Sequence, residues 1–510
     1  MQNRFNNQNT TKRSLLHIVL AGMLSVAVLS GCEKNYLDTA PTNAISTGDA
    51  FKTVDNAWAA LNGMHRMMYK QYYSSQALGG QSANMIYMDA LGEDLVMSGQ
   101  SNGWFISEYK WTSHISATSN ICYYNYLFYY TFVSNANLII LNIDNAEGAE
   151  AEKKVIKGQA LAYRAWAYFQ MIQLFGKRYV AGGDNSGLGL PIVLEPLLEP
   201  RPRNTVEEVY TQINKDIDDA ITNLTGGTAR SNASHINVNV AKGIKARVAL
   251  AQQNWPLAAQ FAAEARAGYP LMSNAEYMSG FNDYSNDEWL WGLHQIEDQT
   301  TYFYSFSAYL SINYNSTNTR TNPKCINSKL YDQISATDIR KKLWDPTGAD
   351  PEFIALRPVQ SGVINPKYQN RKFINAGGSS LSISDVPFMR AAEMYLIEAE
   401  ANARMGGHDA EARAALYTLA VNRDPSYTLS TNSGEDLINE IMIQRRVELW
   451  GEGFRFYDLK RLNLPLDRNG ANHNVSLAVV YDVPAGDPRW QFLIPQTEIN
   501  NTNGIVVQNP

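Results

Sequence analysis

The sequence has little of what metal centres and redox sites require. Its 510 residues include only three cysteines and seven histidines. The histidines are scattered, with no His-x-x-x-His pair and no His–Cys spacing typical of zinc sites. A G-x-x-x-x-G-K phosphate loop and an EF-hand loop are also missing. We therefore expect no metal and no cofactor, and no nucleotide chemistry of the phosphate-loop type.

A long apolar run occurs only near the N-terminus. Three basic residues and no acidic residue precede or flank an apolar run over 15–29, interrupted only by His17 and Ser25. The run is short for a membrane-spanning helix. This order of positive charge followed by a short apolar run is typical of a secretory signal.

The apolar run ends in Leu29-Ser30-Gly31-Cys32, which resembles the lipobox of bacterial lipoproteins. The alternative is an ordinary signal peptide followed by a chance cysteine, but position and flanks together favour the lipobox. We expect a signal peptide at 1–31 and a lipid on Cys32. Residues 32–46 would form a polar tether, and the fold would occupy 47–510.

Basic residues are too few and too scattered for a nucleic-acid-binding protein. The formal net charge is −6, and loss of residues 1–31 removes three positive charges and no negative one, which gives −9. We therefore exclude nucleic acid as a partner. Cys122 and Cys325 remain, and their spacing does not decide whether they form a disulfide.

The chain is rich in apolar and aromatic residues, with 45% hydrophobic residues, 29 tyrosines and 10 tryptophans. Several segments repeat apolar residues at helical spacing, and capping residues mark their ends. The expected helices are one with a stripe from Leu161 to Phe175 that ends at Gly176, one that begins at a Thr205–Glu208 capping box and runs to Leu224, a pair over 240–253 and 257–266, one with a stripe from Phe388 to Ala403 that ends before Gly406-Gly407, one that begins at Asp409, and one over 435–450.

Two of these helix pairs have the small-residue packing of tetratricopeptide repeats, although they do not recur at a fixed period. The stretch 268–384 differs, because it is rich in Asn, Ser, Tyr and Gly. Residues 288–295 within it are compatible with a strand. We expect a helical scaffold, mainly 47–267 and 385–461, beside a loop-rich insert at about 268–384, where ligand binding is favoured.

Six motifs in order resemble the SusD/RagB family of outer-membrane nutrient-binding lipoproteins, and the match covers nearly the whole mature chain. Their order makes a chance match very unlikely. The motifs are Tyr36-Leu37-Asp38 with Pro41, ALAYRAWAYFQMIQLFGKRYV (160–180), AKGIKARVALAQQNWPLAAQFAAEA (241–265), VPFMRAAEMYLIEAEANARMG (386–406), IMIQRRVELWGEGFRFYDLKR (441–461) and FLIPQTEINNTNGIVVQNP (492–510).

The resemblance implies a mostly α fold of tetratricopeptide-like helix pairs with a loop-rich ligand-binding region. It also implies a non-catalytic, lipid-anchored protein that captures oligosaccharides at the outer membrane and delivers them to a SusC-like TonB-dependent transporter. Two alternatives stay open. One is a protein of the same architecture that binds peptides or another nutrient, and the other is a surface glycoside hydrolase. Only the hydrolase predicts release of shorter sugars.

Carboxylates suited to acid–base catalysis are present, but their surroundings favour ion pairs. Glu448 and Glu452 are four residues apart, and basic residues alternate with them along the C-terminal motif. Glu400 and Arg404 form a favourable helical pair. Because no carboxylate pair stands out at the separation that glycosidases require, we expect a structural role and no catalytic residue.

A sugar site needs an exposed aromatic plane flanked by amide or carboxylate groups. Two regions offer this composition. The first holds Tyr72, Tyr73, Glu93, Asp94, Asn102 and Trp104, and the second holds Tyr302, Phe303, Tyr304, Tyr309 and Tyr314.

Family members carry a sugar-stacking Trp on a loop after an acidic pair, followed by a scaffold Trp. By resemblance, Trp104 takes the first role, next to the loop 98–103, and Trp111 the second. Trp289 and Trp291 would share one face of a strand and are better suited to the core. The candidate ligand-binding residues are Trp104, Asn102, Tyr72, Tyr73, Tyr302 and Tyr304.

Overall fold

The computed structural model describes residues 51–509 except 71, 73, 74, 76, 197 and 198. The expected signal peptide and tether, with Cys32, lie outside these residues, as do Tyr73 and the side chain of Tyr302. No helix in the described ranges combines the length and apolar character that crossing a membrane would take. The fold below is that of the compact unit Thr53–Pro510.

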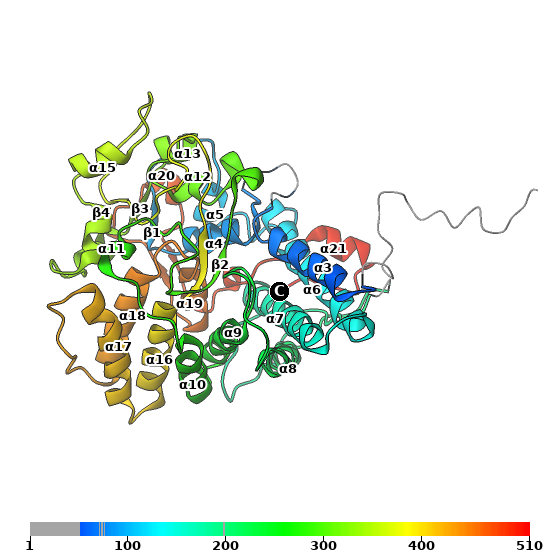
Figure 1. Ribbon diagram of the computed structural model, residues 1–510. Coiled ribbons are helices and arrows are strands. Elements are labelled where there is room, and N and C mark those ends of the chain that lie inside the picture. Colours follow the sequence, from blue (N-terminus) through cyan, green and yellow to red (C-terminus); the bar gives the residue numbers. More distant parts are fainter. Residues whose placement is uncertain (1–50, 71, 73–74, 76, 197–198, 510) are drawn as a thin grey trace, which may run out of the picture. The chain divides into compact units, whose positions relative to one another are not determined.

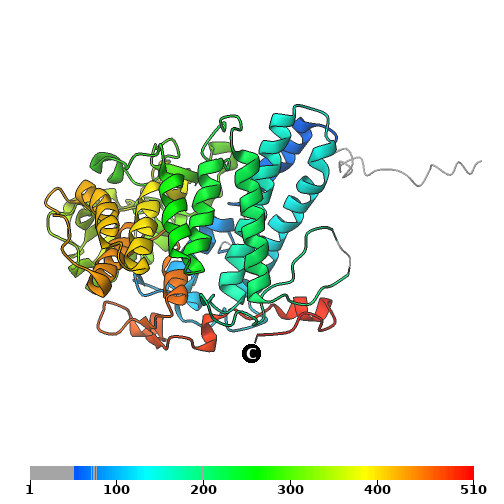
Figure 2. The same ribbon diagram turned by 90° about the horizontal axis from the view of Figure 1, so that it is seen from below.

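A row of helices forms the scaffold, and each packs against the next. Figure 2 shows them side by side, from α6 to the C-terminal helices drawn in yellow and orange. Because α10 packs directly on α16, the insert between them leaves and rejoins the row without breaking it. In order, the helices are α6 (Asn120–Asn142), α7 (Glu150–Phe175), α8 (Val206–Leu224), α9 (Val238–Ala251), α10 (Trp255–Arg266), α16 (Ala391–Met405), α17 (Asp409–Arg423) and α18 (Gly434–Glu448).

The helix ends follow the capping residues seen in the sequence. Thr205 and Glu208 form a capping box at the start of α8, and the Asn254 side chain caps α10. Gly406 and Gly407 both have positive φ where the chain turns from α16 to α17. The mostly α fold is therefore confirmed, together with these helices.

Two expected helix boundaries are wrong. Phe388 lies in strand β6 (Val386–Arg390). The apolar stripe predicted from Phe388 to Ala403 therefore combined a residue of this strand with residues of the helix that follows it. The helix expected to reach Trp450 ends at Glu448. Gly451 and Gly453 then adopt positive φ and turn the chain, so Glu452 is not on the helix with Glu448.

The insert is built of short helices and strands rather than loop alone. Strand β2 (Trp289–Leu293) pairs antiparallel with β6, which joins the insert to the start of α16. Trp289 and Trp291 are buried in the core, as predicted. A second sheet has the order β1-β3-β5-β4, made of β1 (Leu95–Met97), β3 (Lys324–Ile326), β5 (Gln369–Asn370) and β4 (Trp344–Asp345).

The remaining elements complete the described part of the chain (Figure 1). They are α3 (Val54–Met67), α4 (Gly80–Ala90), α5 (Ile106–Tyr109), η1 (Ile143–Asn145), α11 (Asn274–Tyr277), η2 (Glu297–Gln299), η3 (Tyr302–Tyr304), α12 (Ser307–Leu310), α13 (Thr317–Thr321), α14 (Ser328–Asp332), η4 (Ile339–Leu343), α15 (Pro351–Leu356), α19 (Arg455–Arg461), β7 (Leu466–Asp467), α20 (Val475–Ala478), β8 (Asp482–Val483), η5 (Pro488–Trp490) and α21 (Gln496–Asn501).

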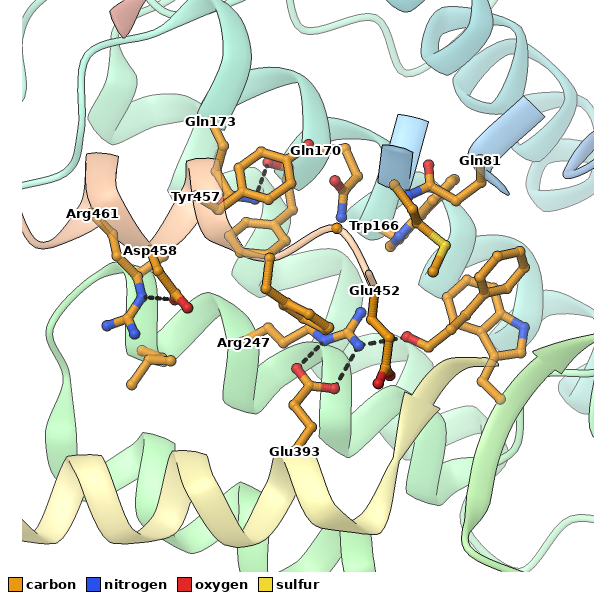
Figure 3. A pocket seen from close by; sticks show the side chains of 18 of the residues that line it. Gln81, Trp166, Gln170, Gln173, Arg247, Glu393, Glu452, Tyr457, Asp458 and Arg461 are labelled. Atoms are coloured by element: carbon orange, nitrogen blue, oxygen red, sulfur yellow. Dashed lines mark hydrogen bonds and ion pairs between the residues drawn. The ribbon is translucent and has the colours of Figure 1, made fainter. Parts of the chain in front are cut away.

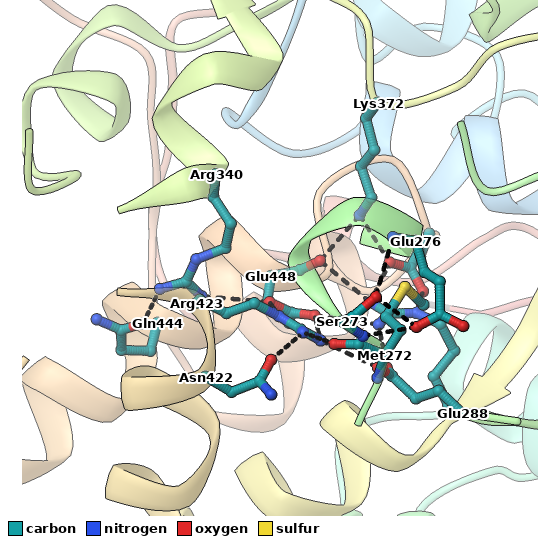
Figure 4. Close-up of polar contacts among 12 residues, drawn as sticks. Met272, Ser273, Glu276, Glu288, Arg340, Lys372, Asn422, Arg423, Gln444 and Glu448 are labelled. Carbon is teal, nitrogen blue, oxygen red and sulfur yellow. Dashed lines mark hydrogen bonds and ion pairs between the residues drawn. The ribbon is translucent and has the colours of Figure 1, made fainter. Parts of the chain in front are cut away.

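A buried ionic cluster joins the scaffold to the insert at Glu448. Figure 4 shows Arg340, from the insert, and Arg423, from the end of α17, converging on this carboxylate. Arg390 Nη1 lies 3.0 Å from Glu448 and 2.5 Å from Glu288, which precedes β2. The side chains of Arg390, Arg423, Glu288 and Glu448 have no exposed surface.

Glu452 and Lys372 extend the cluster. Glu452 lies 2.6 Å from Arg390 and 2.7 Å from Lys372. The Lys372 ammonium also donates to the carbonyl oxygens of Glu448 and Trp450, both at 2.8 Å. Each charge is therefore paired and hydrogen-bonded, which a buried ion needs if it is not to destabilise the fold. The expectation that Glu448 and Glu452 form ion pairs is confirmed.

We expect Glu448→Gln to lower the free energy of unfolding by about 3–5 kcal/mol, because removing one carboxylate leaves three buried guanidinium groups undercompensated. Denaturant unfolding measures this loss. The matched control is Glu435→Gln, since Glu435 is exposed in the first turn of the same helix and should change stability by less than about 1 kcal/mol. Equal effects of the two substitutions would contradict the structural role of the cluster.

The cluster also predicts acid sensitivity. Burial alone would raise the pKa of Glu448, but Arg423, Arg390 and Arg340 hold that pKa well below its usual range. A lowered carboxyl pKa adds stability above the unfolded-state pKa, and this stability is lost as the pH falls through the folded-state pKa. Stability should therefore drop from about pH 5 downward. Denaturant unfolding of Glu448→Gln should show a smaller loss of the free energy of unfolding as the pH falls than in the wild type. Parallel pH profiles of the two proteins would show that Glu448 is not the source of the acid sensitivity.

Candidate functional site

The acidic pair before β1 is buried and fixes the start of this strand. Glu93 and Asp94 are bound by two arginines of the C-terminal motif. Arg446 Nη2 donates to Asp94 at 2.5 Å, and Arg455 Nε donates to Glu93 at 3.0 Å. Burial would raise the pKa of Asp94, but Arg446 and Arg455 lower it. These carboxylates therefore hold the strand in place and are not free to bind a sugar.

The loop after β1 is anchored on α13 of the insert. The backbone N–H groups of Ser98 and Gly99 both donate to the side-chain oxygen of Asn322, at 3.0 and 3.2 Å. Farther along, the Asn318 amide donates to the Asn102 side-chain oxygen at 2.9 Å. The loop is thus bound to a segment more than 200 residues away in the sequence.

Trp104 stands at the end of this loop and is partly exposed. The next residue, Phe105, has a φ of 65° and is buried. Its ring meets those of Tyr87 and Tyr309 edge-on, with centroids 4.8 and 4.7 Å apart. Because Phe105 is clamped in the core, its neighbour Trp104 is held at the surface in a defined position.

The indole N–H of Trp104 is buried, so the polar edge of the ring faces inward and its exposed surface is hydrocarbon. Asn102 beside it is exposed. An apolar ring surface next to an amide is the combination that a sugar ring requires. We call Asn102, Trp104 and the α13 segment the Trp104 face.

The tyrosine-rich part of the insert lies next to this face. Phe303 is 51% exposed, and its ring centroid is 6.4 Å from that of buried Tyr314. Tyr309 is buried as well, so both tyrosines belong to the core. Tyr304 is partly exposed, and α12, which follows it, contacts both η3 and α13. Phe303 and Tyr304 therefore add exposed aromatic surface to a segment that is linked to α13 through α12.

Tyr72 has a different environment from Trp104. It is partly buried, and its ring packs against those of Tyr124 and Phe128 with both centroids at 5.6 Å. Its hydroxyl donates to the Met67 carbonyl oxygen at 3.5 Å. These contacts give Tyr72 a packing role in the described residues.

A cavity between the scaffold helices and α19 is too small for a sugar. It measures about 70 Å³, against the several hundred Å³ typical of ligand pockets. Figure 3 shows that its charged groups are paired. Arg247 donates to Glu393 at 2.7 and 2.6 Å, and Arg461 donates to Asp458 at 2.8 Å. This cavity is part of the packed scaffold.

An N-terminal and a C-terminal segment of the chain match SusD-type family models. Residues 356–510 match the model described as the SusD family, and residues 35–250 match a SusD-like model described as starch-binding, associating with the outer membrane. The chain belongs to the SusD/RagB family. The family description thus supports the expected outer-membrane association.

Relatives of this SusD-family chain match most of its length at low identity. SusD-like protein P38 of Formosa agariphila is 21% identical over 88% of this chain and 91% of its own. A SusD-like carbohydrate-binding protein from Bacteroides vulgatus is 24% identical, with a TM-score of 0.77 over 89% of this chain and 97% of its own. A laminarin-binding SusD-like protein is 21% identical, with a TM-score of 0.69 over 90% and 100%. These structures share the fold.

The structure brings only part of the predicted SusD-family site together. Trp104 and Asn102 share a surface, whereas Tyr72 packs against Tyr124 and Phe128. Trp111 is buried, as expected for the scaffold position, and its indole N–H donates to the Leu91 carbonyl at 2.9 Å. Sequence reasoning missed Asn318 and Asn322, which hold the loop, because nothing in their local sequence indicates a partner so distant. Cys122 and Cys325 are both buried and free.

Proposed function

We propose that this chain captures oligosaccharides at the cell surface and delivers them to a SusC-like TonB-dependent transporter. The Trp104 face carries this proposal, because it places an anchored, partly exposed indole beside an exposed amide. The starch-binding description of the family model supports it, as does the fold shared with a laminarin-binding protein. The lipid on Cys32 would hold the protein at the outer membrane.

The geometry suits binding without catalysis. A sugar ring presents C–H bonds on one face, which pack on an aromatic plane, and hydroxyl groups around its edge, which bond to amides. Trp104 offers the plane and Asn102 the amide. The acidic pair that precedes the loop, Glu93 and Asp94, is neutralised by arginines, so these two carboxylates are poorly placed to act as the acid and nucleophile of a glycosidase.

We expect Trp104→Ala to weaken oligosaccharide binding about tenfold, because a stacking aromatic contributes roughly 1.5 kcal/mol. Calorimetric titration with laminari- and malto-oligosaccharides measures the change. Thermal unfolding should change little, since the indole is partly exposed. Tyr417→Ala is the matched control, because Tyr417 is an exposed aromatic on α17. Unchanged affinity in Trp104→Ala would remove this residue from the site.

A stable transporter partner is the second expectation, and it depends on the lipid anchor. Pull-down after mild detergent extraction from induced cells should recover an outer-membrane barrel with the wild-type chain. Cys32→Ala should release the protein from the membrane fraction, because a chain with no lipid has no anchor. Repeated recovery of the wild-type chain alone would contradict delivery to a transporter, and normal membrane partition of Cys32→Ala would contradict lipidation.

A further inference from the structure

A polar cavity of about 320 Å³ lies at the end of α3. Amide and hydroxyl side chains line it, together with three histidines and Arg66, and no Asp or Glu is among its lining residues. This is unusual in a chain whose formal net charge is −6. The uncharged polar groups include Asn62, Ser231, Asn232 and Gln299.

Arg66 brings a positive charge to this cavity without a counter-charge. Its Nη1 is buried and has no hydrogen-bond partner, and the guanidinium makes no ion pair with any carboxylate of the described residues. The guanidinium lies over the Tyr69 ring, whose centroid is 4.6 Å from Cζ. A partly buried cation with no counter-ion lowers the stability of the fold, so this site favours the binding of an anion.

Two of the three histidines, His65 and His235, do not add to this charge near neutral pH. Burial, and then the neighbouring His235, hold the pKa of His65 well below its usual value. Burial, and then Arg230, lower the pKa of His235 as well. His65 Nδ1 is bonded to the Tyr163 hydroxyl at 2.5 Å, which leaves its buried Nε2 without a partner. The cavity thus offers an imidazole nitrogen beside one guanidinium.

A second cavity of about 590 Å³ adjoins the first, and both are lined by Asn62, Ser231 and His235. Trp58 lines the second cavity and stacks on His235, with centroids 5.6 Å apart and planes at 18°. His235 in turn stacks on His65 at 4.6 Å. The stack holds the indole as a fixed plane, which is the surface that a sugar ring packs against.

Arg230 also lines the second cavity and is bound by neutral groups. It donates to the His235 carbonyl at 3.1 Å and to the Tyr269 hydroxyl at 3.2 Å. Glu152 is the acidic side chain among the residues that line this cavity. Across the two adjoining cavities, positive charge therefore exceeds negative charge.

We propose that these cavities form a second sugar-binding position, specific for acidic oligosaccharides. Arg66 binds the carboxylate or sulfate of one sugar, and Trp58 packs against a neighbouring ring. A planar guanidinium matches both oxyanions through paired N–H donors. The inference deepens the proposed function and rests on it, but it uses residues separate from the Trp104 face.

The test compares oligosaccharides of different charge on the mature wild-type chain. The probes are an oligogalacturonate, which carries carboxylates, a sulfated carrageenan oligosaccharide, and neutral laminari- and malto-oligosaccharides. Calorimetry should show that at least one acidic probe binds more tightly than the neutral ones. The affinity for this acidic probe should fall markedly between about 50 and about 500 mM salt, because salt screens the attraction between charges. The acidic probe that binds identifies the oxyanion.

Substitutions of Arg66 then test whether this side chain supplies the positive charge that binds the acidic probe. We expect Arg66→Gln to weaken the acidic probe by roughly tenfold or more and the neutral probes by less than twofold, because a charge-assisted bidentate contact is lost. Arg66→Lys should give an intermediate loss, since it keeps the charge but not the planar fork. Arg413→Gln is the matched control, because Arg413 on α17 also pairs with no carboxylate within the described ranges and bonds to the Asn432 carbonyl. Thermal unfolding verifies that each variant folds.

The outcomes separate the two proposals. Binding of neutral probes alone, or acidic binding that Arg66→Gln leaves unchanged, overturns the acidic site and leaves the proposed function standing. Failure of every oligosaccharide to bind the wild-type chain contradicts the proposed function, and the acidic site with it. Loss of acidic binding in Arg66→Gln, with neutral binding retained, supports both.

Discussion

The buried cluster around Glu448 and Arg390 is the interaction on which the rest of the structure depends. It joins the ends of α17 and α18 to the insert through Arg423, Arg340 and Glu288. Loss of one partner from a buried ion pair strongly lowers the stability of the fold, so the cluster stabilises a single arrangement of these segments. The same C-terminal motif continues into Arg446 and Arg455, which hold the acidic pair before β1. The scaffold therefore fixes both the insert and the strand that leads to Trp104.

This arrangement separates rigid support from the binding surfaces. The carboxylates Glu448 and Glu452 are buried and paired with arginines. Trp104, Asn102 and Phe303 instead lie at the surface on short segments, and Asn318 holds Asn102 in place. Arg66 is the contrasting case, a cation that no carboxylate of the described residues neutralises. Other buried cations without a carboxylate partner, such as Arg357 and Arg468, donate to backbone carbonyl oxygens instead. Arg66 Nη1 has no such partner, so we expect an outside group to complete its hydrogen bonding.

Sequence reasoning predicted the elements that depend on local signals. The capping box at Thr205 and the paired glycines before α17 mark helix ends, because they act within a few residues. It failed where two kinds of element share one apolar pattern, as at Phe388. The site was only half predictable. The Trp104 loop has a local signature, but its anchors Asn318 and Asn322 lie on a segment that β1–β3 pairing brings close, and such pairing leaves no mark in periodicity.

The central claim is that an anchored aromatic face binds sugar. A crystal structure of the mature chain with a bound oligosaccharide tests it most directly. The account predicts a sugar ring packed on the exposed surface of Trp104, with a hydroxyl within hydrogen-bond distance of Asn102. For an acidic ligand it further predicts an oxyanion at Arg66. An oligosaccharide bound with no contact to Trp104 would contradict the account.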